Sequence, residues 1–157
     1  MYKTVVFDLD GTLLNTLTDL ADAGNRLCRK YGWPTHERQA YRYFVGNGIP
    51  KLVERLAPAD QRTPAVLEAA LADFKRDYGQ HLRDTTAPYP GIPEMLAKLK
   101  ANGVQLAVFS NKADALAKEV VKDYFGTQYF TIVRGQMTGV APKPAAEGTN
   151  ALLQALH

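Results

Sequence analysis

The stretch KTVVFDLDGT, residues 3–12, decides the fold of this chain. Residues 3–9 form a short run of mostly β-branched and aromatic side chains, which is typical of a strand buried in a parallel sheet. The pair Asp10-Gly11 then ends the run. Because open parallel sheets bind ligands where their strands end, Asp8 and Asp10 lie where a functional site is expected.

The chemistry of this strand end follows from the spacing of its two acids. Asp8 and Asp10 would point to the same side of a strand, with Leu9 pointing away. Two carboxylates this close repel each other unless a cation or a shared proton relieves them. Gly11 permits a tight turn, and Thr12 adds a hydroxyl group. The set suits phosphoryl transfer, in which one carboxylate attacks, the other exchanges a proton and a hard cation bridges oxygens. An Asp-Gly turn alone would be ordinary, but the second acid favours a catalytic site.

The segment after this site is predicted to be helical. Apolar residues recur at helical spacing from Leu17 to Tyr31, with Gly32 as the C-cap, and again over residues 49–56. A third helix is predicted over residues 64–78, with Thr63 as its N-cap. Residues 15–87 therefore contain helices and no convincing strand.

The pattern then changes to alternating elements. After turn residues at positions 88–91, the sequence predicts helices over residues 93–101, 113–124 and 145–156, and strands over residues 104–110 and 129–134. Strand–helix–strand spacing implies right-handed crossovers and a parallel sheet. We therefore expect an α/β fold with a Rossmann-like core, residues 1–14 and 88–157, interrupted by a helical domain over residues 15–87.

Composition excludes several functional classes. No apolar stretch approaches the ~20 residues that a membrane helix needs, and the first residues lack a signal-peptide pattern. The single cysteine, Cys28, has no partner for an internal disulfide and is expected to pack on a helix. His36, His81 and Trp33 are expected to be two surface residues and a packing residue, respectively. These features indicate a cytoplasmic protein with no membrane partner.

The charge pattern also disfavours nucleic acid as a partner. The net charge is only +3, and the basic residues are scattered among acids instead of forming a stripe. The segment YRYF, residues 41–44, could stack on bases. A short helix that packs its rings inward and turns Arg42 outward is the better interpretation.

The stretch FDLDGTLLNT, residues 7–16, resembles the first signature of the haloacid dehalogenase (HAD) superfamily, which contains mostly phosphatases. VFSNK, residues 108–112, resembles the second signature, and VAPKPAAEG, residues 140–148, resembles the third. The helical segment matches the cap domain that one class of this superfamily inserts after its first core strand. Within that class, residues 46–56 and 133–144 look most similar to the phosphoglycolate phosphatases.

The resemblance implies a role for each matched acid. Asp8 would be the nucleophile that forms an aspartyl-phosphate, and Asp10 would be the general acid and base. Mg²⁺ would be held by a carboxylate oxygen of Asp8 and the main-chain carbonyl of Asp10. The expected substrate is a small phosphate monoester, most simply phosphoglycolate. A sugar-phosphate mutase and a non-catalytic interaction module remain alternatives.

The resemblance also implies which residues hold the substrate. The phosphoryl oxygens would be bound by Thr12, Ser110, Asn111 and Lys143, and the cap loop Gly46, Asn47 and Gly48 could turn toward the substrate. From the residues alone, a hydroxyl and main-chain N–H groups before a helix suit an anion, although ordinary helix capping by Ser110 and Asn111 would look the same. A Gly-Asn-Gly turn is equally ordinary loop geometry.

The fourth signature of the superfamily, Gly-Asp followed by another acid that completes the magnesium site, has no match. No Gly-Asp pair occurs in the chain, so the sequence looks truncated before this signature. We expect weak Mg²⁺ binding and turnover at least ~10³-fold below that of a complete homologue. Val5 and Phe7 would also lie at an open, apolar sheet edge, which invites self-association.

Overall fold

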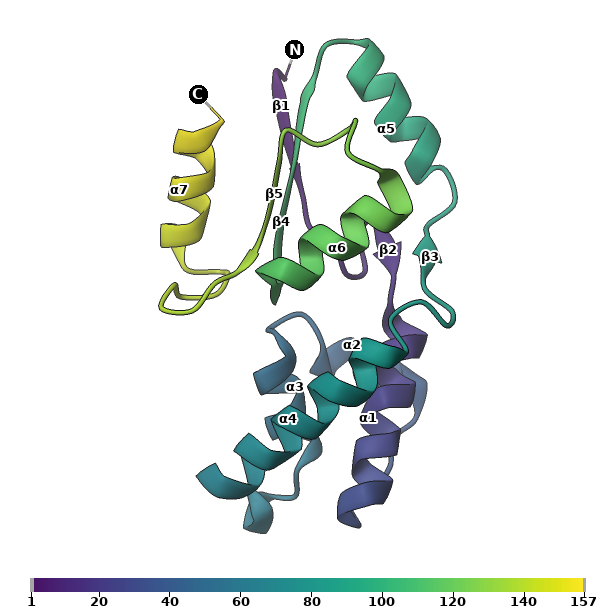
Figure 1. Cartoon of the computed structure of the whole chain (residues 1–157), viewed down its shortest axis with the longest axis vertical. Coiled ribbons are helices and arrows are strands. Elements are labelled where there is room, and N and C mark those ends of the chain that lie inside the picture. The colour runs from purple at the N-terminus through teal and green to yellow at the C-terminus, as the bar shows by residue number, and fades with distance from the viewer. Residues whose placement is uncertain (1, 157) are drawn as a thin grey trace. The chain divides into compact units, whose positions relative to one another are not determined.

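The computed structural model describes residues 2–156, which form two compact units (Figure 1). One unit comprises Met1–Asn15 and Ala87–His157, and the other comprises Thr16–Thr86. We call them the α/β unit and the helical unit. Within residues 2–156, no helix combines the length and the apolar character needed to cross a membrane.

The α/β unit is built on a parallel sheet, which confirms the predicted fold class. Its strands β1 (Thr4–Phe7), β4 (Gln105–Ala113) and β5 (Ile132–Gln136) lie in the order β1-β4-β5. The register of β1 with β4 runs from Thr4↔Gln105 to Phe7↔Val108. The register of β4 with β5 shifts between Phe109 and Ala113, so β4 is irregular near its carboxyl end.

Helices cover both faces of this sheet. Helices α5 (Ile92–Ala101) and α6 (Asp114–Phe125) lie on one face, and α7 (Ala146–Ala155) lies on the other (Figure 1). Alternate residues of β4 point to opposite faces. Leu106 and Val108 pack with residues of α5 and α6, whereas Ala107 and Phe109 pack with residues of α7. The sheet is therefore the middle layer of a three-layer sandwich.

Strand β1 forms one edge of the described sheet. Val5 and Phe7 are half-buried against the α5 and α6 side, so they are less exposed than the sequence suggested. Val6 points to the opposite face and keeps 40% of its surface exposed. The apolar side chain open to solvent on this edge is therefore Val6.

The helical unit is a small bundle of four α-helices and two short 3₁₀ turns. In chain order its elements are α1 (Leu17–Tyr31), η1 (Arg38–Ala40), α2 (Tyr41–Phe44), α3 (Ile49–Leu56), η2 (Ala59–Gln61) and α4 (Pro64–Gln80). The predicted caps are confirmed: Gly32 ends α1 with φ of 69°, and the Thr63 side chain accepts a hydrogen bond from Val66 N–H at the start of α4.

The packing roles predicted for two residues of this unit are also confirmed. Cys28 and Trp33 are buried, and burial raises the pKa of the Cys28 thiol to about 11. His36 and His81 are partly exposed. In α2, however, only part of the prediction is right, because Tyr41 is buried whereas the ring of Tyr43 points into solvent.

Asp19 joins the two ends of the helical unit. Its buried carboxylate accepts hydrogen bonds from the main-chain N–H groups and the hydroxyls of Thr85 and Thr86, at 2.6–3.1 Å. The residues that directly precede and follow this unit in the chain belong to the α/β unit, where β2 (Leu14–Asn15) and β3 (Ala87–Pro88) pair antiparallel. The expectation of a strand-free segment over 15–87 is therefore wrong at its ends, because two-residue strands leave no periodic pattern.

Candidate active site

The loop after β1 is a tight turn closed on one carbonyl. The carbonyl oxygen of the buried Leu9 accepts hydrogen bonds from the N–H groups of Thr12, Leu13 and Leu14 at 3.0–3.2 Å. Gly11 has φ of 81°, a conformation that side chains other than glycine rarely adopt. This turn fixes the main chain of the two acids that flank Leu9.

Lys143 contacts the first of these acids. Its Nζ lies 2.8 Å from Oδ1 of Asp8, although the two residues are 135 positions apart in the chain. The same ammonium donates to the carbonyl oxygen of Phe109 at 2.5 Å and lies 5.2 Å from the centre of the Phe109 ring. The carboxylate of Asp8 is 44% exposed, so it is both paired with a cation and open to a ligand.

Asn111 fixes the main chain of Lys143. Its Nδ2 donates to the Lys143 carbonyl oxygen at 3.1 Å, and the Lys143 N–H donates to its Oδ1 at 2.8 Å. Both ends of the carboxamide are thus used to hold the segment that resembles the third signature. The predicted phosphate contact of Asn111 stays a prediction, and the structure adds this supporting role.

Lys112 contacts the second acid, Asp10. Its Nζ lies 3.1 and 3.2 Å from the two carboxylate oxygens of Asp10, and its main-chain N–H donates to Oγ of Ser110 at 3.1 Å. The sequence patterns predict no role for this lysine. The available signal was its place in VFSNK, because a lysine at the end of a buried strand needs an anionic partner.

Helix α6 starts later than the sequence predicts. Strand β4 continues to Ala113, which is the N-cap of α6 and makes no side-chain capping bond. Ser110 and Asn111 therefore do not cap this helix, and that interpretation is wrong. The strand is longer than predicted because Ala113 still pairs with Gln136 beyond the irregularity.

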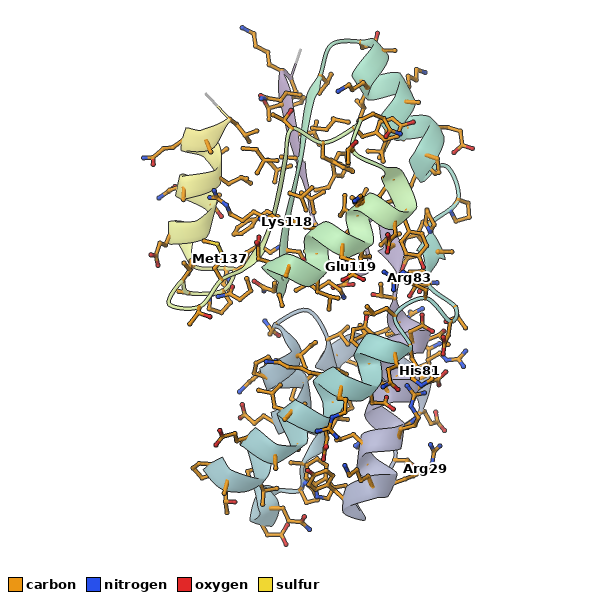
Figure 2. The ribbon with its side chains drawn as sticks, viewed as in Figure 1. Arg29, His81, Arg83, Lys118, Glu119 and Met137 are labelled. Atoms are coloured by element: carbon orange, nitrogen blue, oxygen red, sulfur yellow. The ribbon has the colours of Figure 1, made fainter. Side chains whose placement is uncertain are left out.

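Asp114, the first residue of α6, ties this helix to β5. Its Oδ1 accepts the Gly135 N–H at 2.9 Å, and its Oδ2 pairs at 2.7 Å with Lys118, which projects from α6 (Figure 2). Burial alone would raise the pKa of the Asp114 carboxyl, but these hydrogen bonds outweigh it and hold the pKa below its usual value. Asp114 stays ionised and fixes the end of β5 beside the end of β4.

The predicted site residues fall into two groups. The first group lies in the α/β unit, near the carboxyl ends of β1 and β4. It contains two hydrogen-bonded sets, Asp8–Lys143–Asn111 and Asp10–Lys112–Ser110. Thr12 is exposed in the turn. The Gly46–Gly48 loop belongs to the helical unit, where Asn47 accepts a hydrogen bond from Arg55 at 2.9 Å. Its predicted substrate contact stays a prediction.

The oxygen atoms of this site suit a hard divalent cation. Mg²⁺ is usually held by one or two carboxylates, with waters and phosphate oxygens completing its shell. The accessible carboxylate of Asp8 fits one such ligand. Residues 2–156 contain no group of three or more His, Cys, Asp or Glu side chains that could hold a metal ion by themselves. The Asp8 carboxylate thus fits a cation whose other ligands are waters and phosphate oxygens.

Comparisons with known proteins place the chain in a family. The family model for haloacid dehalogenase-like hydrolases matches residues 5–157. The chain is 33% identical over 145 residues to a phosphoglycolate phosphatase of Thiobacillus denitrificans and 34% identical over 146 residues to one of Neisseria meningitidis. These matches cover 90% and 91% of this chain but only 64% and 62% of those proteins.

A solved structure gives the same result. The fold matches the crystal structure of a candidate phosphoglycolate phosphatase of Lactobacillus delbrueckii subsp. bulgaricus with a TM-score of 0.90 and 28% identity. The match covers 99% of this chain and 73% of that one. The chain belongs to the haloacid dehalogenase-like hydrolases.

Proposed function

We propose that this chain carries the phosphoryl-transfer site of a phosphatase that hydrolyses a small phosphate monoester, with phosphoglycolate as the first substrate to test. The contact between Asp8 and Lys143 carries the proposal. It joins the first-signature and third-signature segments at 2.8 Å and pairs a nucleophile with the cation that an incoming phosphoryl group needs. The phosphoglycolate phosphatases among its relatives support the choice of substrate.

In the first step, a carboxylate oxygen of Asp8 attacks phosphorus and the bond from phosphorus to the ester oxygen breaks. The ester oxygen takes a proton from the carboxyl of Asp10 and leaves as an alcohol. The ammonium of Lys143 lies beside the attacking carboxylate and stabilises the negative charge of the phosphoryl oxygens. The product of this step is an aspartyl-phosphate at Asp8.

In the second step, Asp10 accepts a proton from a water molecule as the water oxygen attacks phosphorus. The bond between phosphorus and the Asp8 oxygen breaks, which releases inorganic phosphate and restores both carboxyl groups. Bound by the Asp8 carboxylate and the Asp10 main-chain carbonyl, Mg²⁺ would neutralise charge on the phosphoryl group. The helical unit would act as the cap, with Gly46, Asn47 and Gly48 contacting the substrate.

The proposal is tested with Asp8→Asn. Release of phosphate from phosphoglycolate should depend on Mg²⁺ and be lost in this variant, and an acid-stable mass increment of one phosphoryl group should be trapped on wild-type Asp8 alone. Asp22→Asn, which changes an exposed acid on α1, serves as the matched control. Equal phosphate release by Asp8→Asn, or a trapped phosphoryl group elsewhere, would contradict the mechanism. Analysis of the products separates a phosphatase, which releases inorganic phosphate, from the alternative sugar-phosphate mutase, which returns the phosphoryl group to its sugar substrate.

The rate should be low. With Asp8 and one carbonyl as fixed ligands, the 157-residue chain should turn over at least ~10³-fold more slowly than a homologue that supplies further carboxylate ligands, because the metal ion contributes several kcal/mol and each ~1.4 kcal/mol is tenfold in rate. If this chain matched the rate of such a homologue, no further ligand would be needed.

A further inference from the structure

Lys112 is a buried cation with no part in the reaction described so far. Only 3% of its side chain is exposed, and its ammonium lies at almost equal distances, 3.1 and 3.2 Å, from the two oxygens of Asp10. Asp10 itself is 18% exposed on its side chain. A buried ammonium is costly unless it is paired and hydrogen-bonded, so its position beside both oxygens is specific.

The two partners of this pair come from different elements. Asp10 lies in the turn after β1, whereas Lys112 lies in β4, the middle strand of the described sheet. The main-chain N–H of Lys112 is fixed by Ser110, and the next residue, Ala113, still pairs with β5. The orientation of the Asp10 carboxyl is thus set from the sheet and not from its own turn.

The two acids are served by separate lysines. Lys143 reaches Asp8, and Lys112 reaches Asp10. The Lys143 ammonium lies beside the exposed nucleophile, where it can also bind phosphate. The Lys112 ammonium is buried against Asp10, so the ion pair accounts for its position without a ligand. Its contacts restrict the rotation of one carboxyl group.

We propose that Lys112 is a positioning residue, which holds the Asp10 carboxyl in the orientation that gives a proton to the leaving oxygen. This inference rests on the proposed function. When one oxygen of Asp10 carries the proton, the other can still accept a hydrogen bond from the Lys112 ammonium. The carboxyl therefore keeps one orientation as it releases the proton to the ester oxygen and takes another from water.

The leaving group provides the test. An alkoxide leaving group needs a proton, whereas p-nitrophenolate leaves without one. General acid catalysis contributes typically ~10²–10⁴-fold, so Lys112→Met should lower the rate at which phosphoglycolate phosphorylates Asp8, measured by rapid quench in a single turnover, by about 10²-fold. It should change the rate of Asp8 phosphorylation by p-nitrophenyl phosphate by less than about 3-fold, because p-nitrophenolate leaves without the Asp10 proton. The later attack of water uses Asp10 with either ester, so only the first step separates the two substrates. Lys112→Arg, which keeps the charge, should recover part of the loss.

Three further variants separate the inference from the proposed function. Asp10→Asn should show the same selectivity, and combining it with Lys112→Met should add no further loss, because both changes remove one function. Lys118→Met, which removes an exposed lysine of α6 (Figure 2), should leave both rates unchanged.

Loss of selectivity in Asp10→Asn, or no Mg²⁺-dependent hydrolysis of either ester by the wild-type chain, would overturn the proposed function. Equal slowing of both esters by Lys112→Met, with selectivity kept in Asp10→Asn, would overturn the positioning role alone.

The inference can also be tested without Lys112→Met, in case that variant does not fold, by measuring hydrogen exchange of the Lys112 ammonium group. In nuclear magnetic resonance spectra of lysine ammonium groups, Lys112 should give a signal with slow hydrogen exchange, and this exchange should become faster in Asp10→Asn. Lys118, in its exposed pair with Asp114, should exchange fast in both proteins. A Lys112 signal that exchanges as fast as that of Lys118, or one whose exchange is unchanged by Asp10→Asn, would overturn the proposal.

Discussion

Asn111 and Lys143 are joined by a reciprocal pair of hydrogen bonds, 2.8 and 3.1 Å long, between the carboxamide of one and the main chain of the other. This pair holds the lysine that contacts Asp8. Asn111→Ala should therefore lower kcat for phosphate release by roughly 10-fold or more, because one lost hydrogen bond of about 1.4 kcal/mol corresponds to that factor.

Asn111→Asp tests the same pair from one side. The aspartate keeps the acceptor for the Lys143 N–H but loses the donor to its carbonyl, so its rate should lie below that of the wild type. Steady-state kinetics with phosphoglycolate checks both variants, and Asn102→Ala, an exposed asparagine after α5, is the control. Full activity of Asn111→Ala would show that the pair does not position Lys143.

Gly135 allows the close approach of β5 to the start of α6. A Cβ atom at this position would lie 2.4 Å from the Lys112 carbonyl oxygen and 2.5 Å from Cα of Asp114, and both are main-chain atoms that cannot rotate away. Gly135→Ala should destabilise the fold by about 1–3 kcal/mol in urea unfolding. Gly79→Ala, on the exposed side of α4 with open space around it, should stabilise by up to about 1 kcal/mol. Equal effects of the two changes would contradict this packing.

Asp19 makes stability depend on pH at the acid end. Burial raises the pKa of its carboxyl, but the hydrogen bonds from Thr85 and Thr86 outweigh burial and hold the pKa below its usual value. The stabilisation is therefore full above the unfolded pKa of about 3.9 and is lost as the pH falls through it toward the folded pKa.

Asp19→Asn should cost roughly 2–3 kcal/mol at neutral pH, because it places an amide donor against donors. The difference from the wild type should shrink as the pH falls below about 4. Unfolding curves at several pH values measure this, with Asp22→Asn on the same helix as the exposed control. A difference that grows toward acid pH would have the wrong sign.

The β1 edge should promote association. An unpaired, apolar strand edge is a template for another strand, and lysine is one of the residues that blunt such edges. Val6→Lys should therefore lower the sedimentation coefficient at high protein concentration. Leu153→Lys on α7 is the matched control, since Leu153 is 41% exposed and Val6 is 40% exposed. If the wild-type chain stays monomeric, or if both changes have equal effects, the β1 edge is not the site of self-association.

Much of the α/β fold could be predicted because strong local patterns carry it. Residues 3–12 identify a buried strand that ends in acids, and Gly32 and Thr63 mark helix ends through main-chain and hydroxyl chemistry that is local in sequence. The strand boundaries were harder. The end of β4 at Ala113 depends on pairing with Gln136, which no local pattern contains.

The candidate site was predictable only in part for the same reason. The signatures led to Asp8, Asp10 and Lys143. The partner of Asp10 was missed, because the burial of Lys112 and its distance from Asp10 depend on how residues 102 positions apart come together. Side chains that act through other side chains leave the weakest trace in a single sequence.

The antiparallel pairing of Asn15 with Ala87 makes the helical unit a modular insertion. The core chain leaves and returns at adjacent positions of β2 and β3, so a hairpin turn would bridge the same gap as the residues of the insertion. Loop-closure entropy grows only with the logarithm of loop length, so exchanging inserts of different size changes core stability little. If the helical unit acts as the proposed cap, replacing this insert would change substrate preference while the proposed phosphoryl-transfer residues keep their positions.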